Sequence, residues 1–288
     1  MIRTTRPDLP ASCVLCVALH VIHGPGGSTM PNENWRTAAA YDYLADLDTA
    51  GVAFEFLRRN PDYQADCKRI VSQDAPGADD EAKSAGLARR WGLAFLADPQ
   101  VRAGEQTVFW LPDVLASTIV LVALNGRWDG PSLAYDPENW PGLIALREAP
   151  GGVFIQLRDD GTVHYLWLPS RPDEGESVAA ILPFDDSAQV RIDATAAFWR
   201  TLARKRSKQR RSPPLWKARL IPALQALDGR QSGASYRAIA TALYGEERIA
   251  AAAWKTSSLR DTTIRLVRRG LFLMRGGYRR LLGKSPDD

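Results

Sequence analysis

Apolar side chains recur every three to four residues where the regular part of the chain begins, a spacing that predicts amphipathic helices. Ala39, Tyr43 and Leu47 are four residues apart, which places them on one face of a helix. A polar stretch with Pro and Gly at 74–81 then predicts a hinge. The expected helices of this small module, which spans residues 30–78, cover residues 35–47, 54–60 and 62–73.

The pattern changes between residues 87 and 186 to short apolar runs rich in β-branched and aromatic residues, which predict strands. Residues 153–158 and 162–168 flank Asp159-Asp160-Gly161, and an Asp-Gly pair between two such runs is typical of a hairpin. We therefore expect an antiparallel β-rich middle region. Its other strand-like runs cover residues 107–111 and 118–124.

Helical spacing returns in the C-terminal part of the chain. Leu220, Leu224 and Leu227 line one face of a helix that we expect to end at Gly229. Ser235 is placed to cap the next helix, and a further glycine is placed to stop it. The expected helices cover residues 215–227, 235–245, 246–253 and 258–269.

The last of these helices has an apolar face and a basic face. Leu259, Thr263 and Val267 form one stripe, whereas Arg265 and Arg268 lie away from it. A recognition helix has this arrangement, because its apolar face packs on its domain while its polar face enters the DNA groove.

A β-hairpin is expected directly after this helix. Ser258 and Asp261 form a weak capping box at the start of the helix, and Gly270 is placed to end it. Gly276-Gly277 then separates two short apolar runs over residues 271–275 and 278–282, a strong signal for a short hairpin loop. Three helices followed by a hairpin is the order of a winged helix-turn-helix.

These patterns predict an α+β chain with a small N-terminal helical module, an antiparallel β-rich middle and a C-terminal winged helix-turn-helix. The leader contains Cys13, Cys16, His20 and His23, but on a helix its first and last members would lie about 15 Å apart and could not share a zinc ion. We expect the leader to be disordered or to precede a native start at Met30. The expected regions are the leader 1–29, the helical module 30–78, the β-rich region 87–186 and a basic helix with the DNA-binding domain 187–288.

Charge is divided unevenly along the chain. The last 92 residues contain 21 Lys and Arg against 6 Asp and Glu, whereas the first 196 contain 16 against 27. Residues 204–211 hold six cations and no acid, which favours phosphate contact over a merely solvated helix face. The imbalance predicts that the C-terminal part binds duplex DNA and that the acidic part binds protein.

No pattern of a catalytic or cofactor site accompanies these features. Beyond the leader the single histidine is His164, and there is no G-x-S-x-G elbow, no Walker A motif and no G-x-G-x-x-G after a strand. Three cysteines do not make a disulfide framework, and no apolar run reaches the roughly 18–20 residues that span a bilayer. We therefore expect a cytoplasmic protein without enzymatic activity, cofactor, metal or membrane contact.

Three blocks of sequence together carry a family resemblance. They are Trp35 with Tyr41-Asp-Tyr-Leu and Phe56-Leu-Arg-Arg-Asn-Pro-Asp-Tyr63, Trp91-Gly-Leu-Ala-Phe-Leu-Ala-Asp-Pro99 with Phe109-Trp-Leu-Pro-Asp-Val, and Tyr236-Arg-Ala-Ile-Ala with Trp254-Lys-Thr-Ser-Ser-Leu-Arg-Asp-Thr-Thr-Ile-Arg-Leu-Val-Arg and Gly276-Gly-Tyr-Arg. The chain resembles, over residues 35–282, proteobacterial regulators that pair a short N-terminal domain of uncharacterised type with a C-terminal helix-turn-helix variant. That family includes activators of excision and transfer of integrative conjugative elements. The C-terminal domain is also similar to that of an oligomeric activator of type VI secretion genes.

The resemblance implies DNA-binding transcriptional activation. We expect a homo-oligomer that binds a specific DNA sequence and activates genes of mobile-element transfer or secretion. Because the acidic part of the chain does not favour DNA electrostatically, we expect Trp35–Tyr63 to contact RNA polymerase or an antiactivator. Two alternatives stay open. One is an excisionase-like recombination accessory factor, and the other is a protein-binding antiactivator without DNA contact, the role of some small relatives that carry only the C-terminal domain. The expected DNA-binding residues are Lys255, Thr256, Ser257, Ser258, Arg260, Arg265, Arg268, Arg275, Arg279, Arg204, Lys205, Arg206, Arg210 and Arg211.

Overall fold

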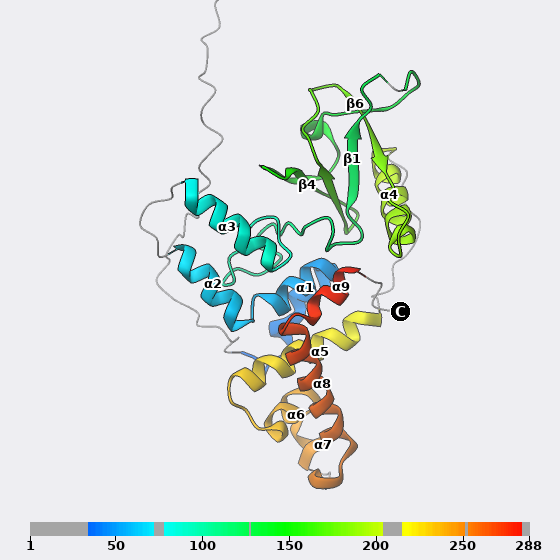
Figure 1. Ribbon diagram of the computed structural model, residues 1–288. Coiled ribbons are helices and arrows are strands. Elements are labelled where there is room, and N and C mark those ends of the chain that lie inside the picture. The colour runs from blue at the N-terminus through cyan, green and yellow to red at the C-terminus, as the bar shows by residue number, and fades with distance from the viewer. Residues whose placement is uncertain (1–33, 72–77, 127, 204–214, 251–252, 284–288) are drawn as a thin grey trace, which may run out of the picture.

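The computed structural model describes residues 34–71, 78–126, 128–203, 215–250 and 253–283. Helices and strands occupy different parts of the molecule (Figure 1). A six-stranded sheet with α4 on one side stands above a body of helices, and α6, α7 and α8 form the lower tip. The α+β class predicted from the sequence is confirmed.

The N-terminal segment is helical, as predicted, but its helices begin and end elsewhere. Residues expected to form the first α-helix form a 3-10 helix instead. Asp48 caps the next helix by accepting a 2.8 Å hydrogen bond from the Gly51 N–H, so Gly51 lies inside a helix that it was expected to precede. The expected hinge at 74–81 is wrong in its second half, because a helix already begins at Ala78. The elements are η1 (Ala38–Asp46), α1 (Thr49–Leu57), α2 (Pro61–Val71) and α3 (Ala78–Arg90).

The sheet has the strand order β2-β6-β1-β5-β4-β3. The predicted hairpin is confirmed as β4 and β5, and positive φ angles of 45° at Asp160 and 75° at Gly161 fit its two-residue turn. The expectation of a purely antiparallel region is wrong, because β1 pairs in parallel with β5. The strands are β1 (Ile119–Ala123), β2 (Leu133–Ala134), β3 (Leu143–Ala149), β4 (Gly152–Asp159), β5 (Thr162–Leu168) and β6 (Ser177–Ile181), with η2 (Pro137–Asn139) before β3.

A short apolar run predicts an extended strand, but it does not predict which strand it pairs with or in which direction, and this explains the unexpected parallel pairing of β1. β1 lies between β6 and β5, which are later in the chain, so sequence order says nothing about its pairing. Residues 107–111 do not form a strand, and Trp110 makes only an isolated bridge with Leu93. That segment is buried nonetheless, and its Val108 carbonyl accepts a 2.5 Å hydrogen bond from Gln156 on β4.

Helix α4 (Ala188–Leu202) covers the sheet and shares its core. Phe198 is buried, and its ring lies 6.0 Å from that of Trp140. Thr201 connects helix to sheet, because its hydroxyl lies 3.0 Å from His164 Nε2 and donates to Asp159 at 2.9 Å. The expected basic tract at 204–211 follows α4 and lies outside the described residues.

The C-terminal helices follow the sequence pattern closely up to the last one. Ser235 caps its helix by accepting from the Ala238 N–H at 3.2 Å, and Gly245 ends it with φ 89°, both as predicted. The elements are α5 (Leu215–Gln231), α6 (Tyr236–Tyr244), α7 (Glu246–Ala250), η3 (Trp254–Thr256), α8 (Ser258–Met274), η4 (Gly277–Arg279) and α9 (Arg280–Gly283).

The predicted hairpin over residues 271–282, and with it the wing, is wrong. Leu271 and Met274 continue the apolar face of α8, so the helix runs on to Met274 and turns only at Gly276, where φ is 120°. Gly270 and Gly229 were expected to end helices but lie inside them. A Cβ on Gly270 would come within 2.6 Å of the Ala223 carbonyl oxygen, so this glycine permits α8 to approach α5 closely. A Cβ on Gly229 would meet Trp35 at 3.0 Å.

The core of the helical body is formed by the N-terminal segment and the C-terminal helices together. One hydrophobic cluster contains Phe54 and Leu57 from α1 together with Leu224 from α5 and Leu282 from α9. A smaller cluster packs Trp35 against α5, α6 and α8. The N-terminal segment therefore belongs to the same packed unit as the C-terminal helices, whereas the sheet and α4 have a hydrophobic cluster of their own.

Candidate nucleic-acid interface

Helix α8 is held in place by its apolar face. Thr263 and Val267 are fully buried, at 0% and 1% exposure, and Val267 belongs to a hydrophobic cluster with Ala226 of α5 and Ile239 of α6. The Thr263 hydroxyl donates to the Leu259 carbonyl at 2.7 Å, so this buried polar group is satisfied inside the helix. The inward stripe predicted from the sequence is confirmed, and the opposite face of α8 is left for solvent.

The outward face of α8 carries polar and basic side chains. Asp261, Arg265 and Arg268 are exposed. A shallow hollow on the first half of the helix is lined by Ser258, Arg260, Asp261, Ile264, Arg265 and Arg268. The structure therefore brings together four of the predicted DNA-binding residues on one concave surface.

Two contacts orient arginines within this hollow. Arg265 donates from Nη2 to the Thr262 hydroxyl at 3.1 Å, one turn earlier on the helix. Arg260 lies 3.4 Å from Asp261, and both side chains are well exposed, so this ion pair is weak and easily exchanged for another partner. These contacts orient the guanidinium groups of Arg260 and Arg265 and leave N–H donors of each able to bind another partner.

The segment that leads into α8 presents further predicted residues. Lys255 and Thr256 are exposed in the short helix η3. Ser257 is the N-cap of α8 and accepts from the Leu259 N–H at 3.2 Å, so the expected capping box of Ser258 and Asp261 is wrong, because Ser258 is already the first residue of the helix. An N-terminus with exposed N–H groups, hydroxyls and a lysine suits a phosphate oxygen.

The other end of α8 lies beside the N-terminal helices. Arg275 and Arg279 are exposed there, about 24 Å along the helix from its start, since each residue adds about 1.5 Å. Arg279 donates to the Arg90 carbonyl at 2.6 Å, and the Tyr278 hydroxyl donates to the Trp91 carbonyl at 2.8 Å. These two predicted arginines therefore do not share the hollow with Arg265.

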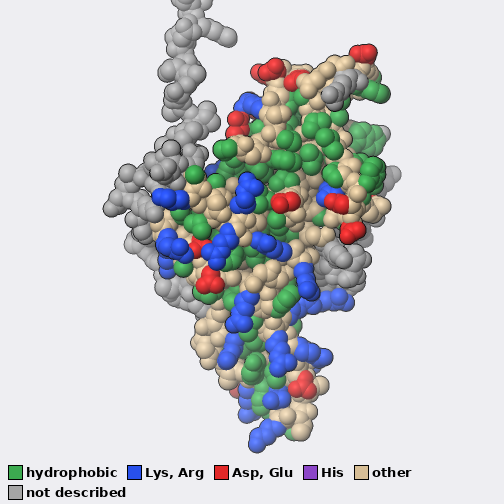
Figure 2. Space-filling view, viewed as in Figure 1, with side chains coloured by type: hydrophobic (Ala, Val, Ile, Leu, Met, Phe, Trp, Pro, Cys, Tyr) green, Lys and Arg blue, Asp and Glu red, His purple; other side chains and the backbone are tan. Residues whose placement is uncertain are grey.

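Lys and Arg side chains gather on the lower half of the molecule, as Figure 2 shows. On this face they run along the tip and continue upwards to the region of α2 and α3. Arg69 and Arg90 from those helices are 69% and 61% exposed and were missed by the sequence analysis. No local pattern marks them, because only the fold brings both to Asp66 and places Arg90 next to Arg279.

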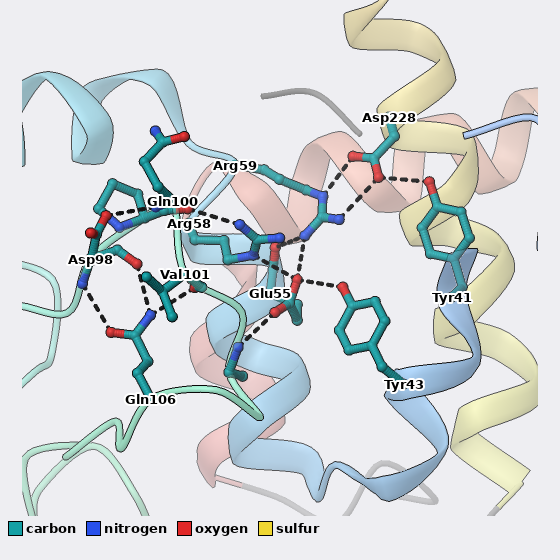
Figure 3. A network of polar contacts seen from close by, with 12 residues as sticks. Tyr41, Tyr43, Glu55, Arg58, Arg59, Asp98, Gln100, Val101, Gln106 and Asp228 are labelled. Atoms are coloured by element: carbon teal, nitrogen blue, oxygen red, sulfur yellow. Dashed lines mark hydrogen bonds and ion pairs between the residues drawn. The ribbon is translucent and has the colours of Figure 1, made fainter. Parts of the chain in front are cut away.

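A buried polar network fastens the N-terminal segment to α5 (Figure 3). Arg59 lies between two carboxylates: its Nε is 2.6 Å from Asp228, and its Nη1 is 2.6 Å from Glu55. The Tyr41 hydroxyl donates to Asp228, and the Tyr43 hydroxyl donates to Glu55, each at 2.7 Å. Arg59 and Asp228 are 169 residues apart, so this ion pair joins the N-terminal helical segment to α5.

The buried side chains Glu55 and Arg59 of this network are stabilised in their charged forms. Burial opposes ionisation of Glu55, but Arg59 and Arg58 outweigh it and hold the pKa of this carboxyl at about 2. Burial likewise opposes the charge on Arg59, and the two carboxylates more than offset it, so the pKa of the guanidinium is raised. Removal of Glu55, Arg59 or Asp228 would leave a buried charge with fewer opposite charges around it.

The aromatic side chains of the Trp35–Tyr63 segment are also part of the fold. Trp35, Tyr41 and Tyr63 are at most 2% exposed. The exposed side chains of this segment are small or charged, and include Asp42 and Asp46. A protein partner at this segment would therefore meet those side chains and not the aromatic ones.

Within the described residues, no helix is long and apolar enough to cross a membrane. The same residues contain no group of three His, Cys, Asp or Glu side chains placed to hold a metal ion. The cysteine and histidine pattern at 13–23 lies outside the described residues.

A helix with a buried apolar face, a basic outer face and a capped, exposed N-terminus has the arrangement of a recognition helix. Two family models match the chain. Residues 181–283 match the one described as T6SS, Transcription factor, DNA binding domain, and residues 34–96 match the Proteobacterial transcriptional regulator-like domain. The chain thus carries the N-terminal and C-terminal domains of a proteobacterial DNA-binding transcriptional regulator, and the resemblance noted in the sequence is confirmed. No curated protein sequence matches it.

Proposed function

We propose that the protein reads duplex DNA with the outer face of α8 and activates genes of mobile-element transfer or of secretion. The observation that carries this proposal is the hollow on α8, where Arg265 and Arg268 are exposed on a helix whose other face is fixed by Thr263 and Val267. In a groove, an arginine fork pairs best with the O6 and N7 of guanine. Arg265 is our choice for such a contact.

The other predicted residues are assigned to the DNA backbone. Lys255, Thr256, Ser257, Ser258 and Arg260 lie at or just before the start of α8, where helix N–H groups, hydroxyls and cations favour phosphate. Arg275 and Arg279 lie at its far end. For Arg204, Lys205, Arg206, Arg210 and Arg211, which are outside the described residues, the assignment rests on charge alone.

The test is selection of bound DNA by the purified full-length chain from a pool of random duplexes. We expect one recurrent sequence, because base contacts by α8 would favour it by roughly 4–10 kcal/mol over non-specific DNA. The matched control is Arg171→Gln, an exposed arginine of the sheet region that should leave the selected sequence unchanged. Failure to enrich any sequence would refute specific reading.

The regulatory direction needs a separate measurement. Transcription from a promoter that carries the selected sequence should rise when the protein is added with RNA polymerase. A fall would reverse the proposed direction, and enrichment of an attachment site that has no promoter would favour a recombination accessory role. In this proposal the protein acts as a homo-oligomer, and a polymerase or antiactivator contact at the N-terminal segment uses exposed side chains such as Asp42 and Asp46.

A further inference from the structure

The N-terminal helices carry a small basic surface that the DNA-binding domain does not account for. It is formed by Arg69 on α2 and Arg90 at the end of α3, which both pair with Asp66. The Asp66 side chain is only 1% exposed, whereas the two arginines are more than half exposed. The Asp66 carboxylate is therefore hidden beneath the two cations, whereas Asp62, one turn earlier on α2, is exposed beside them. We call this pair of arginines the α2/α3 surface.

The arginines of this surface are held outwards by several contacts. Arg90 Nη1 lies 3.2 Å from Asp66, and its guanidinium also lies 5.2 Å from the centre of the Trp91 ring. The Trp91 indole N–H donates to Asp66 at 2.9 Å, so the carboxylate keeps a partner of its own in addition to both arginines. Fixed, exposed guanidinium groups of this kind suit an anion that approaches from solvent.

The surface is continuous with the basic face of the C-terminal domain. Arg279 donates to the Arg90 carbonyl at 2.6 Å, which places the end of α3 against η4. Residues 262–283 contain six arginines and no acidic residue. Figure 2 shows the resulting band of cations rising from the tip to α2 and α3. An extended anion that lies along α8 beyond Asp261 meets no acidic residue of the 262–283 stretch before it reaches this surface.

We infer that the α2/α3 surface binds the phosphate backbone of the DNA that flanks the segment read by α8. The inference rests on the proposed function and extends it to the N-terminal domain. Duplex DNA carries one negative charge per about 1.7 Å along its axis, so a band that is longer than the roughly 24 Å of α8 meets phosphates beyond the bases that α8 reads. The N-terminal domain then contributes to affinity and not to sequence preference.

The experiment measures the affinity of the full-length protein for two duplexes at several salt concentrations. One duplex has about 12 base pairs, which is about one helical turn, and the other has about 30 base pairs, which is about three turns. In Arg69→Gln/Arg90→Gln the loss of two phosphate contacts should reduce the salt slope on the long duplex by about 1.8. Between 50 and 200 mM salt the wild-type affinity should then fall about 12-fold more than that of the variant. On the short duplex the two proteins should behave alike.

Two further variants separate charge from folding. Arg69→Lys/Arg90→Lys keeps both charges and should keep the wild-type salt slope. Arg69→Gln alone leaves Arg90 and Trp91 on Asp66, so it should fold normally and lose a slope of about 0.9, a difference of about 3-fold over the same salt range. Unchanged slopes for both glutamine variants on the long duplex would overturn the inference, as would an equal loss on the short duplex.

Failure of the inference can be told apart from failure of the proposed function by a variant of α8 in the same titrations. If Arg265→Ala weakens binding while the glutamine variants do not, α8 reads DNA and the α2/α3 surface has no part in it. If Arg265→Ala and the glutamine variants are all without effect, the proposed function and the inference fall together.

Discussion

The helical body and the sheet region bury different kinds of side chain. Among the described residues, the buried Asp, Glu, Lys and Arg side chains are Glu55, Arg58, Arg59, Asp66 and Asp228, and all of them lie in the helical body. The sheet region buries apolar side chains with a few uncharged polar ones such as Gln156 and Thr201. Buried charges need specific partners, whereas apolar groups need only contact. The fold of the helical body therefore depends more on specific polar contacts than the fold of the sheet region does.

The outer surfaces of the two regions also differ: the sheet region exposes large hydrophobic side chains, and the helical body exposes cations. Seven of the eight large hydrophobic side chains that are exposed among the described residues lie in the sheet region, and Phe272 is the exception. The helical body presents cations instead, most of them on α8 and the segments beside it. Because its buried ion pairs fix α8 through α5, the unit that we expect to bind DNA includes the N-terminal helices.

The largest effect is expected from Asp228→Ala. This change leaves Arg59 buried with one carboxylate where it had two, and loss of one partner of a buried pair costs about 3–5 kcal/mol. Urea unfolding should show this loss in the transition of the helical body. Asp173→Ala, an exposed acid of the sheet region, is the control and should stay within about 0.5 kcal/mol of wild type. A loss below about 1 kcal/mol for Asp228→Ala would mean that the buried network does not hold the N-terminal segment against α5.

Acid should weaken the helical body through Glu55. Its pKa is lowered from 4.5 to about 2, so the unfolded chain takes up the proton first as the pH falls. The stability that the carboxylate provides is complete above pH 4.5 and is lost progressively towards pH 2, by about 3 kcal/mol in all.

Unfolding free energies at pH 5 and pH 3, for wild type and for Glu55→Gln, isolate this contribution. Burial raises the pKa of Asp48, which has the opposite dependence on pH, but Asp48 is present in both proteins. The wild type should lose more stability than the variant over this range. Equal losses in the two proteins would show that Glu55 is not held as the charged form.

A smaller effect is expected where α8 meets α5. Gly270→Ala would bring a Cβ within 2.6 Å of the Ala223 carbonyl and 2.8 Å of the Leu227 side chain, and such overpacking costs about 1–3 kcal/mol. Gly86→Ala in α3 has no atom within 4 Å of the new Cβ, so it should instead stabilise by about 0.5–1 kcal/mol. Thermal unfolding of the two variants measures the difference. If both changes were stabilising, the close approach of α8 to α5 would be wrong.

Local signals in the sequence predicted local structure well. The cap at Ser235, the stop at Gly245 and the hairpin turn at Asp160-Gly161 are each set by neighbouring residues. The two faces of α8 were also predictable, because they follow from helical spacing alone. One local signal that failed was Gly276-Gly277, since the run before it suits a strand and the end of an amphipathic helix equally.

Contacts between distant segments could not be predicted in this way. Arg59 is one of many arginines in the sequence, and nothing near it points to Asp228. The same holds for Arg90, which becomes part of a basic band only because Arg279 lies against it. Gly229 and Gly270 were interpreted as helix ends because the sequence does not show that another element, Trp35 or α5, packs closely against them.

The most direct test of the account compares two arginines of one helix. Arg265 lines the hollow on α8, whereas Arg269 is exposed on the same helix outside it. Each is changed to Ala, and both proteins are titrated with the selected duplex and with a scrambled duplex at the same salt concentration. Arg265→Ala should cost about 1–3 kcal/mol on the selected duplex and little on the scrambled one, with weaker preference at one or two base positions.

Arg269→Ala should affect the two duplexes equally, because Arg269 lies outside the hollow and is not expected to contact bases. An equal loss on both duplexes for Arg265→Ala, or a larger loss of specificity for Arg269→Ala, would contradict the claim that the hollowed face of α8 reads the DNA.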